Sequence, residues 1–183
     1  MARLFTGEEL SAALGKLVAQ LVEKEIETDI YVVGGAAFLL RQIARRSTVD
    51  VDAKLTSSEL VLEVAKDLGI QNGWAPNWFN NAARIFVPFD TDYSAWELYA
   101  TSGQVNVYLA PFEDLLIMKL NAARPNRDDE DLRFLIEHFE FQTVDEISYV
   151  YETRCPGDTL STKAIQLVTQ LLNENRSINI GLE

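Results

Sequence analysis

The sequence is poor in the residues that build disulfides and metal clusters. It contains one cysteine, Cys155, and one histidine, His138, in 183 residues. A single cysteine cannot form a disulfide within the chain, and no group of Cys and His has zinc-ligand spacing. A disulfide-stabilised scaffold and a zinc module are therefore excluded. We expect a structural role for His138, because it falls in the last turn of an acidic helical segment.

Long apolar runs are also missing. No stretch approaches the ~20 apolar residues of a membrane span, and no apolar run follows a basic start. We therefore expect a cytoplasmic protein without a membrane segment. The hydrophobic fraction of 48% excludes intrinsic disorder. The length predicts a single domain over residues 1–183, with a core at about 26–137 and a helical appendage at about 138–183.

Basic residues are few. The 16 Lys and Arg face 28 Asp and Glu, which gives a formal net charge of -12. This balance excludes a surface that adheres broadly to nucleic acid or anionic lipid, but not a local basic site. Seven of the basic residues lie in or beside the motifs described below: Arg41, Arg45, Arg46, Lys54, Lys119, Arg124 and Arg127.

The pattern of apolar residues predicts a mixed α/β (α+β) fold with a helical C-terminal part. Strands are predicted at 30–33, 49–55, 83–89, 95–100 and 105–109, with a turn at 101–104. Capping boxes at 6–9, 56–59 and 143–146 predict three helix starts, and Gly69 predicts a helix end. Of Trp74, Trp78 and Phe79 in the following loop, we expect at least two to cover the core, with base stacking as the alternative.

Two motifs carry chemistry. The apolar strand at 30–33 runs into Gly34-Gly35, and the strand at 49–55 carries Asp50 and Asp52. Alternation predicts one face with Val49, Val51, Ala53 and Leu55, and the other with Asp50, Asp52 and Lys54. Carboxylates about 7 Å apart on one face can share hard divalent cations, and Mg²⁺ binds carboxylate and phosphate oxygens together. The pattern therefore favours nucleotide chemistry.

The diglycine itself supports the same interpretation. It lets the backbone turn sharply and approach a ligand, and a helix beginning near Ala36 would direct free N–H groups at a phosphate. The alternative is a tight strand-to-helix turn with nothing bound. A second Asp-x-Asp at 90–92 follows Pro88 in a turn context, and we interpret it as a loop feature.

The order of these motifs resembles the nucleotidyltransferase superfamily, the fold shared by DNA polymerase beta and the antibiotic-modifying nucleotidyltransferases. A closer likeness is to uncharacterised bacterial nucleotidyltransferase-like proteins related to the abortive-infection toxins of AbiEii type. Those carry a Lys on a helix after the last core strand and then Arg-Asp-x-x-Asp. Lys119 and the segment from Arg127 to Asp131 match this pattern, and the resemblance spans roughly residues 26–137.

The resemblance implies a magnesium-dependent site for a nucleoside triphosphate. Asp50 and Asp52 would bind metal and, with Lys119, act in catalysis. The nucleotide would contact a wider set: Gly34, Gly35, Arg46, Thr48, Lys119 and Asp131. For Lys119 and Asp131 an ion pair between consecutive helices is an equal alternative.

The third carboxylate of the superfamily is missing from the strand expected to carry it. Asn106 occupies that position as a metal ligand, which places a two-ion site in doubt because an amide is neutral. Glu97 would substitute if the register of the 95–109 hairpin brought it across from Asp52.

Two function classes follow. The first is an enzyme that transfers a nucleoside monophosphate to a hydroxyl of RNA, protein or a small molecule, as one member of a toxin–antitoxin pair with a cognate partner protein. The second is a catalytically weakened fold that binds nucleotide or another protein, as an antitoxin or scaffold. The sequence makes no prediction of the oligomeric state.

Overall fold

The computed structural model describes residues 3–43, 47–87 and 91–180. These residues form two compact units: the first comprises the described residues up to 85 together with 92–111, and the second comprises 86–87, 91 and 112–180. The last passage of the chain from the first unit to the second follows Pro111. None of the described helices is long and apolar enough to span a membrane.

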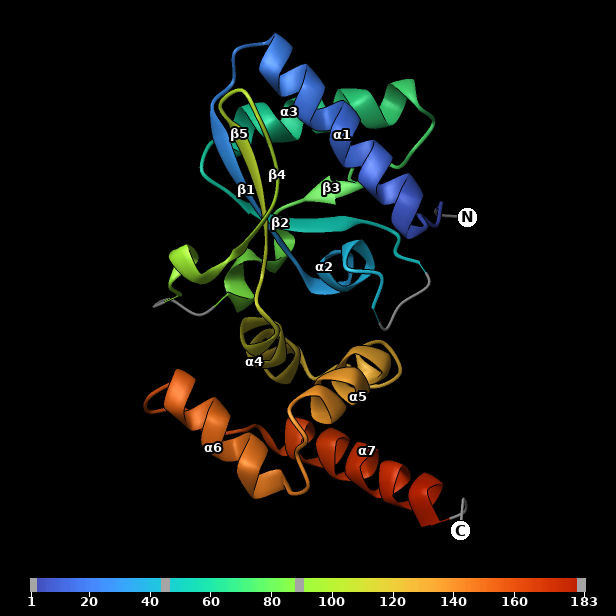
Figure 1. Cartoon of the computed structure of the whole chain (residues 1–183), viewed down its shortest axis with the longest axis vertical. Helices are drawn as coiled ribbons and strands as arrows, with labels where there is room; N and C mark the ends of the chain where they lie inside the picture. Colours follow the sequence, from blue (N-terminus) through green and yellow to red (C-terminus); the bar gives the residue numbers. More distant parts are fainter. Residues whose placement is uncertain (1–2, 44–46, 88–90, 181–183) are drawn as a thin grey trace. The chain divides into compact units, whose positions relative to one another are not determined.

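The first unit contains a sheet and three α-helices (Figure 1). In chain order its elements are α1 (Gly7–Glu23), β1 (Thr28–Val33), α2 (Gly34–Leu40), β2 (Val51–Leu55), α3 (Ser58–Gln71), β3 (Phe79–Asn80), the 3-10 turns η1 (Ala82–Phe86) and η2 (Tyr93–Ala95), β4 (Glu97–Ser102) and β5 (Val105–Leu109). The second unit is helical, with α4 (Phe112–Ala122), α5 (Asp129–His138), α6 (Val144–Arg154) and α7 (Thr162–Ile180).

The five strands form one mixed sheet in the order β3-β2-β1-β5-β4. β1 is parallel to β5 and antiparallel to β2, while β3 is parallel to β2 and β4 antiparallel to β5. The predicted α/β class is therefore confirmed, and the strands predicted at 30–33, 49–55 and 105–109 correspond to three neighbouring strands, β2, β1 and β5. The segment 83–89 was predicted as a strand, which is wrong over the part that η1 occupies.

The sheet has two different faces. Alternate residues are buried in the core, among them Ile30, Val32, Val51, Ala53 and Val107. This face contacts α1, α2 and α3, and we call it the helical face. The intervening residues are half-buried, including Tyr31, Asp52, Lys54, Asn106 and Tyr108, and we call their side the open face. Alternation of side chains along each strand therefore separates a core side from a side that carries polar and aromatic groups.

Two of the three predicted capping boxes form. Thr6 and Thr143 each accept a hydrogen bond from the backbone N–H three residues on, and the Glu at that position bonds back. The box at 56–59 is wrong. Thr56 Oγ1 instead accepts from Asp29 N at 2.9 Å, and the cap of α3 is Ser57 without a side-chain cap bond.

Gly69 lies inside α3 and does not end it. A Cβ at Gly69 would lie 2.8 Å from Trp78 Cδ1, so the absent side chain makes room for the indole ring. Trp78 and Phe79 are 1% and 2% exposed, which confirms that two of the three loop aromatics cover the core. Trp78 Nε1 donates to Ala65 O at 2.7 Å, which ties the loop to α3.

Candidate functional site

The diglycine turn and Asp52 meet at one end of the sheet. Asp52 pairs in register with Val33, the residue before Gly34. Gly34 has a φ of +62°, and a Cβ built on it would lie 3.6 Å from Asp52 Oδ2. The carboxylate of Asp52 therefore lies directly against the turn. Helix α2 begins at Gly34 rather than near Ala36, so both glycines belong to its first turn.

Asp50 lies just before β2 and is positioned by the N-terminal segment. Phe5 and Thr48 exchange backbone hydrogen bonds of 2.7 and 3.0 Å, and Thr48 Oγ1 donates to Asp50 O at 3.0 Å. The Thr48 hydroxyl thus orients the backbone of Asp50. Val49 was predicted to share a face with Val51, but it lies before β2 and is 40% exposed, whereas Val51 is buried. Arg46, predicted to contact nucleotide, lies outside the described residues.

Asn106 is held at the other end of the sheet. It pairs in register with Asp29, four residues before Val33 on β1, which corresponds to about 13 Å along the strand. Its Nδ2 donates to Asp29 Oδ1 at 2.9 Å. The prediction that Asn106 shares a metal with Asp52 is therefore wrong, because the parallel register of β5 separates them.

Glu97 does not complete the site either. It pairs in register with Leu109, a buried residue of the helical face. There it forms a 2.8 Å ion pair with Arg41, at the end of α2. Asp52 is on the opposite face of the sheet, with β1 and β5 between β2 and β4.

The residue beside Asp52 on its other flank is Asn80. Sequence reasoning missed this neighbour because β3 has only two residues and no periodicity. Asn80 Oδ1 accepts from Ala82 N at 2.9 Å. Both strand neighbours of Asp52 are therefore uncharged. Among the described residues, no three His, Cys, Asp or Glu side chains gather in a way that would hold a metal ion.

Lys119 and Asp131 lie in the second unit, within a buried ionic cluster. The ammonium of Lys119 is 2.6 Å from both Asp128 Oδ1 and Asp131 Oδ2, and both carboxylates are fully buried. Arg124 Nε lies 2.9 Å from Asp128 Oδ2. We call these four side chains the Lys119 cluster. Its geometry is that of the ion pair between consecutive helices, which was one of the two alternatives for Lys119.

Asp128 is charged in this setting. Burial would raise its pKa, but the hydrogen bonds from Arg124 and the charge of Lys119 together outweigh burial, so the pKa is lowered. The cluster thus contains two cations and two carboxylates that compensate one another, with Lys119 and both carboxylates buried and Arg124 41% exposed.

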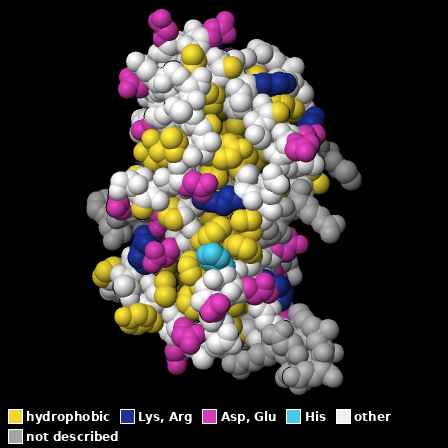
Figure 2. Space-filling model, viewed as in Figure 1, with side chains coloured by type: hydrophobic (Ala, Val, Ile, Leu, Met, Phe, Trp, Pro, Cys, Tyr) yellow, Lys and Arg dark blue, Asp and Glu magenta, His cyan; other side chains and the backbone are white. Residues whose placement is uncertain are grey.

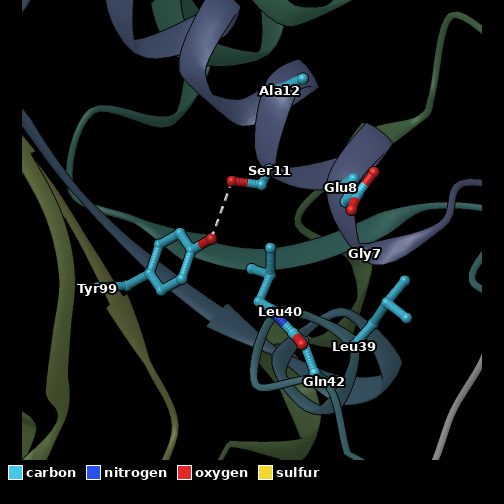
Figure 3. A pocket seen from close by; sticks show the side chains of 8 residues that line it. All are labelled: Gly7, Glu8, Ser11, Ala12, Leu39, Leu40, Gln42 and Tyr99. Carbon is cyan, nitrogen blue, oxygen red and sulfur yellow. Dashed lines mark hydrogen bonds between the residues drawn. The ribbon is translucent and has the colours of Figure 1, made fainter.

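A separate pocket of about 410 Å³ opens beside the start of α1 and the end of α2 (Figure 3). Tyr99 closes one side, and its hydroxyl lies 3.0 Å from Ser11 Oγ. None of the predicted site residues lines this pocket. On the face drawn in Figure 2, Lys and Arg side chains are scattered among Asp and Glu and form no patch.

Comparisons with known proteins give one relationship. No curated protein and no solved structure matches the chain. A family model described as "Nucleotidyltransferase of unknown function (DUF6036)" matches residues 10–173, which includes the diglycine, Asp50, Asp52 and the Lys119 cluster. The chain belongs to this family of nucleotidyltransferases whose function is unknown.

Proposed function

We propose that this protein transfers a nucleoside monophosphate from a magnesium-bound nucleoside triphosphate to a hydroxyl of an RNA, a protein or a small molecule. Gly34, Gly35, Asp50 and Asp52 form the site in this proposal. The observation that carries it is the position of the Asp52 carboxylate, against a glycine with a φ of +62°. Such a turn leaves room for a phosphate to approach the backbone beside a metal-binding oxygen.

The donor atoms suit magnesium. Mg²⁺ prefers hard oxygen ligands, and it is usually bound by one or two carboxylates together with substrate phosphates. Asp50 and Asp52 supply that number. When bound, the ion neutralises charge on the triphosphate and lowers the pKa of an attacking hydroxyl. The structure supports this proposal through the Asp52 carboxylate, which lies against Gly34, and through Thr48, which fixes the backbone at Asp50.

A second candidate function rests on the neighbours of Asp52. Val33 and Asn80 flank it in register, and neither carries a charge. A site with two carboxylates binds one magnesium–nucleotide more readily than two metal ions, which transfer chemistry uses in pairs. The alternative is therefore a catalytically weakened fold that binds nucleotide and signals to a partner protein.

The test separates binding from transfer. Each α-labelled nucleoside triphosphate is incubated with the protein, Mg²⁺ and total cell RNA and protein, and calorimetry measures nucleotide affinity in parallel. We expect wild type to transfer label and Asp52→Asn to lose both transfer and Mg²⁺-dependent binding. Asp67→Asn, on the exposed side of α3, is the matched control.

Binding without transfer would favour the second candidate. Equal transfer by Asp52→Asn and wild type would overturn the site. The relation to AbiEii-type toxins and a role in a toxin–antitoxin pair stay predictions. They require that expression of the protein arrests growth and that Asp52→Asn relieves the arrest.

A further inference from the structure

The open face of the sheet carries a row of aromatic rings next to Asp52. Tyr31, Lys54 and Tyr108 lie opposite one another in register across β2, β1 and β5. Of these three residues, Lys54 lies two positions along β2 from Asp52, about 7 Å away, on the same face. Asp29 and Asn106, joined by a hydrogen bond, close the far side of the row.

The rings are packed in contact with one another. Tyr31 stacks on Tyr108 with centroids 5.1 Å apart and an interplanar angle of 15°. From η2 and the residue that follows it, Tyr93 and Trp96 lie 4.6 and 5.3 Å from Tyr31. Trp96 is 5% exposed, while the three tyrosines are only half-buried. We call these four residues the aromatic row.

Lys54 lies at the border between the aromatic row and Asp52. Its ammonium is 4.0 Å from the centroid of the Tyr93 ring and donates to the Tyr93 hydroxyl. An ammonium group over an aromatic face retains further N–H donors for an anion. The open face thus presents a carboxylate, then a cation, then a set of rings.

We infer that the aromatic row binds the base of the nucleoside triphosphate whose phosphates lie at Asp52. This inference rests on the proposed function and names the part of the substrate that the sheet contacts. A nucleotide has the same order of chemistry as the open face: an anionic chain that takes metal and a cation, then a planar ring. Aromatic side chains on the face of a sheet are a recurrent surface for stacking bases.

The net charge of the protein favours a mononucleotide over a polynucleotide as the source of the base. A formal net charge of -12 opposes a long polyanion, because polynucleotide affinity depends on neutralising many phosphates. A mononucleotide needs only local neutralisation, which Lys54 and a magnesium ion supply. The base of a single nucleotide therefore fits this surface better than a stacked run of bases in RNA.

The experiment compares nucleotide with its phosphates alone. Calorimetry with Mg²⁺ measures the affinities of ATP, CTP and inorganic tripolyphosphate for wild type, Tyr108→Leu and Tyr108→Phe. Removing one stacking ring is expected to weaken ATP binding about tenfold and leave tripolyphosphate unchanged. Tyr108→Phe keeps the ring and should bind as wild type. Tyr99→Leu, a tyrosine bonded to α1 on the helical face, is the matched control.

A second variant guards against loss of fold. Tyr93→Leu removes a ring from the short η2 turn and should weaken ATP binding in the same selective way. Two results would overturn this inference but not the proposed site. One is that tripolyphosphate binds as tightly as ATP, and the other is that neither leucine variant changes ATP affinity. Binding of neither ligand would overturn the proposed site as well. RNA binding that Tyr108→Leu abolishes while ATP binding persists would assign the row to an acceptor and overturn the inference.

Discussion

Gly34 has a backbone conformation that other residues reach only with strain. Its φ of +62° is left-handed, and a side chain there costs about 1–2 kcal/mol. The added Cβ would lie in ordinary van der Waals contact with Asp52 Oδ2 at 3.6 Å, so the strain comes from the backbone conformation. We predict that Gly34→Ala lowers the free energy of unfolding by about that amount and weakens Mg²⁺–nucleotide binding. Urea denaturation and calorimetry measure the two effects.

Gly15 provides the control for this substitution. It lies exposed in the interior of α1, and nothing lies within 4 Å of its added Cβ. Gly15→Ala should stabilise the protein by roughly 0.5–1 kcal/mol, because alanine is the better helix former. Equal stability changes in the two variants would show that the turn at Gly34 carries no special strain.

Asp128 makes the free energy of unfolding depend on pH in the acidic range. Its pKa is lowered in the folded state because the bonds from Arg124 and Lys119 outweigh burial. The stabilisation is therefore present above the ordinary value of 3.8 and is lost as pH falls through the lower folded pKa. We predict that wild type loses more stability than Asp128→Asn between about pH 4 and pH 2. Urea denaturation across that pH range measures the stability of both proteins. Equal loss of stability in wild type and Asp128→Asn would contradict the prediction.

Residues whose partners are close in sequence could be predicted, and those with distant partners could not. Thr6 and Thr143 each bond three residues on, so the local sequence predicts their caps. Thr56 has the same local pattern, but its hydroxyl bonds Asp29 on β1. Asp52 was placed in the right strand, whereas Asn106 was assigned to the wrong end, because register depends on how β1 and β5 pair.

Helices α4 and α5 are joined by the Lys119 cluster. Lys119 is the shared cation of two fully buried carboxylates, so its removal leaves uncompensated charge away from water. We predict that Lys119→Met lowers the free energy of unfolding by about 3–5 kcal/mol. Thermal and urea denaturation of the full chain measure this loss.

Arg133 is the control for that variant because its ion pair with Glu174 joins α5 to α7 nearer the surface. The two side chains are 32% and 41% exposed, so Arg133→Met should cost no more than about 1 kcal/mol. If both variants lost the same stability, the cluster would not be the link between α4 and α5, and Lys119 would return as a candidate ligand for a triphosphate.

The same dependence on distant partners limits what the sequence predicts for whole elements. Strands β1 and β5 were found because continuous apolar or alternating runs mark them. β3 has two residues, and its pairing with β2 comes from the loop that Trp78 anchors on α3. The uncharged neighbour of Asp52 was therefore invisible to periodicity.

The charge of the whole molecule gives a way to test the proposed magnesium site. With a net charge of -12, the excess acidic side chains repel one another. Added NaCl screens this repulsion, so it should raise the melting temperature of wild type and of Asp52→Asn alike. Mg²⁺ at matched ionic strength should raise it further in wild type only, because binding to the native state stabilises it in proportion to site occupancy. Calorimetric melting in both salts separates the two effects. An equal extra rise in the melting temperature of Asp52→Asn would place magnesium elsewhere on the acidic surface. If Mg²⁺ gave wild type no extra rise in melting temperature, the carboxylates would bind the ion only together with a nucleotide.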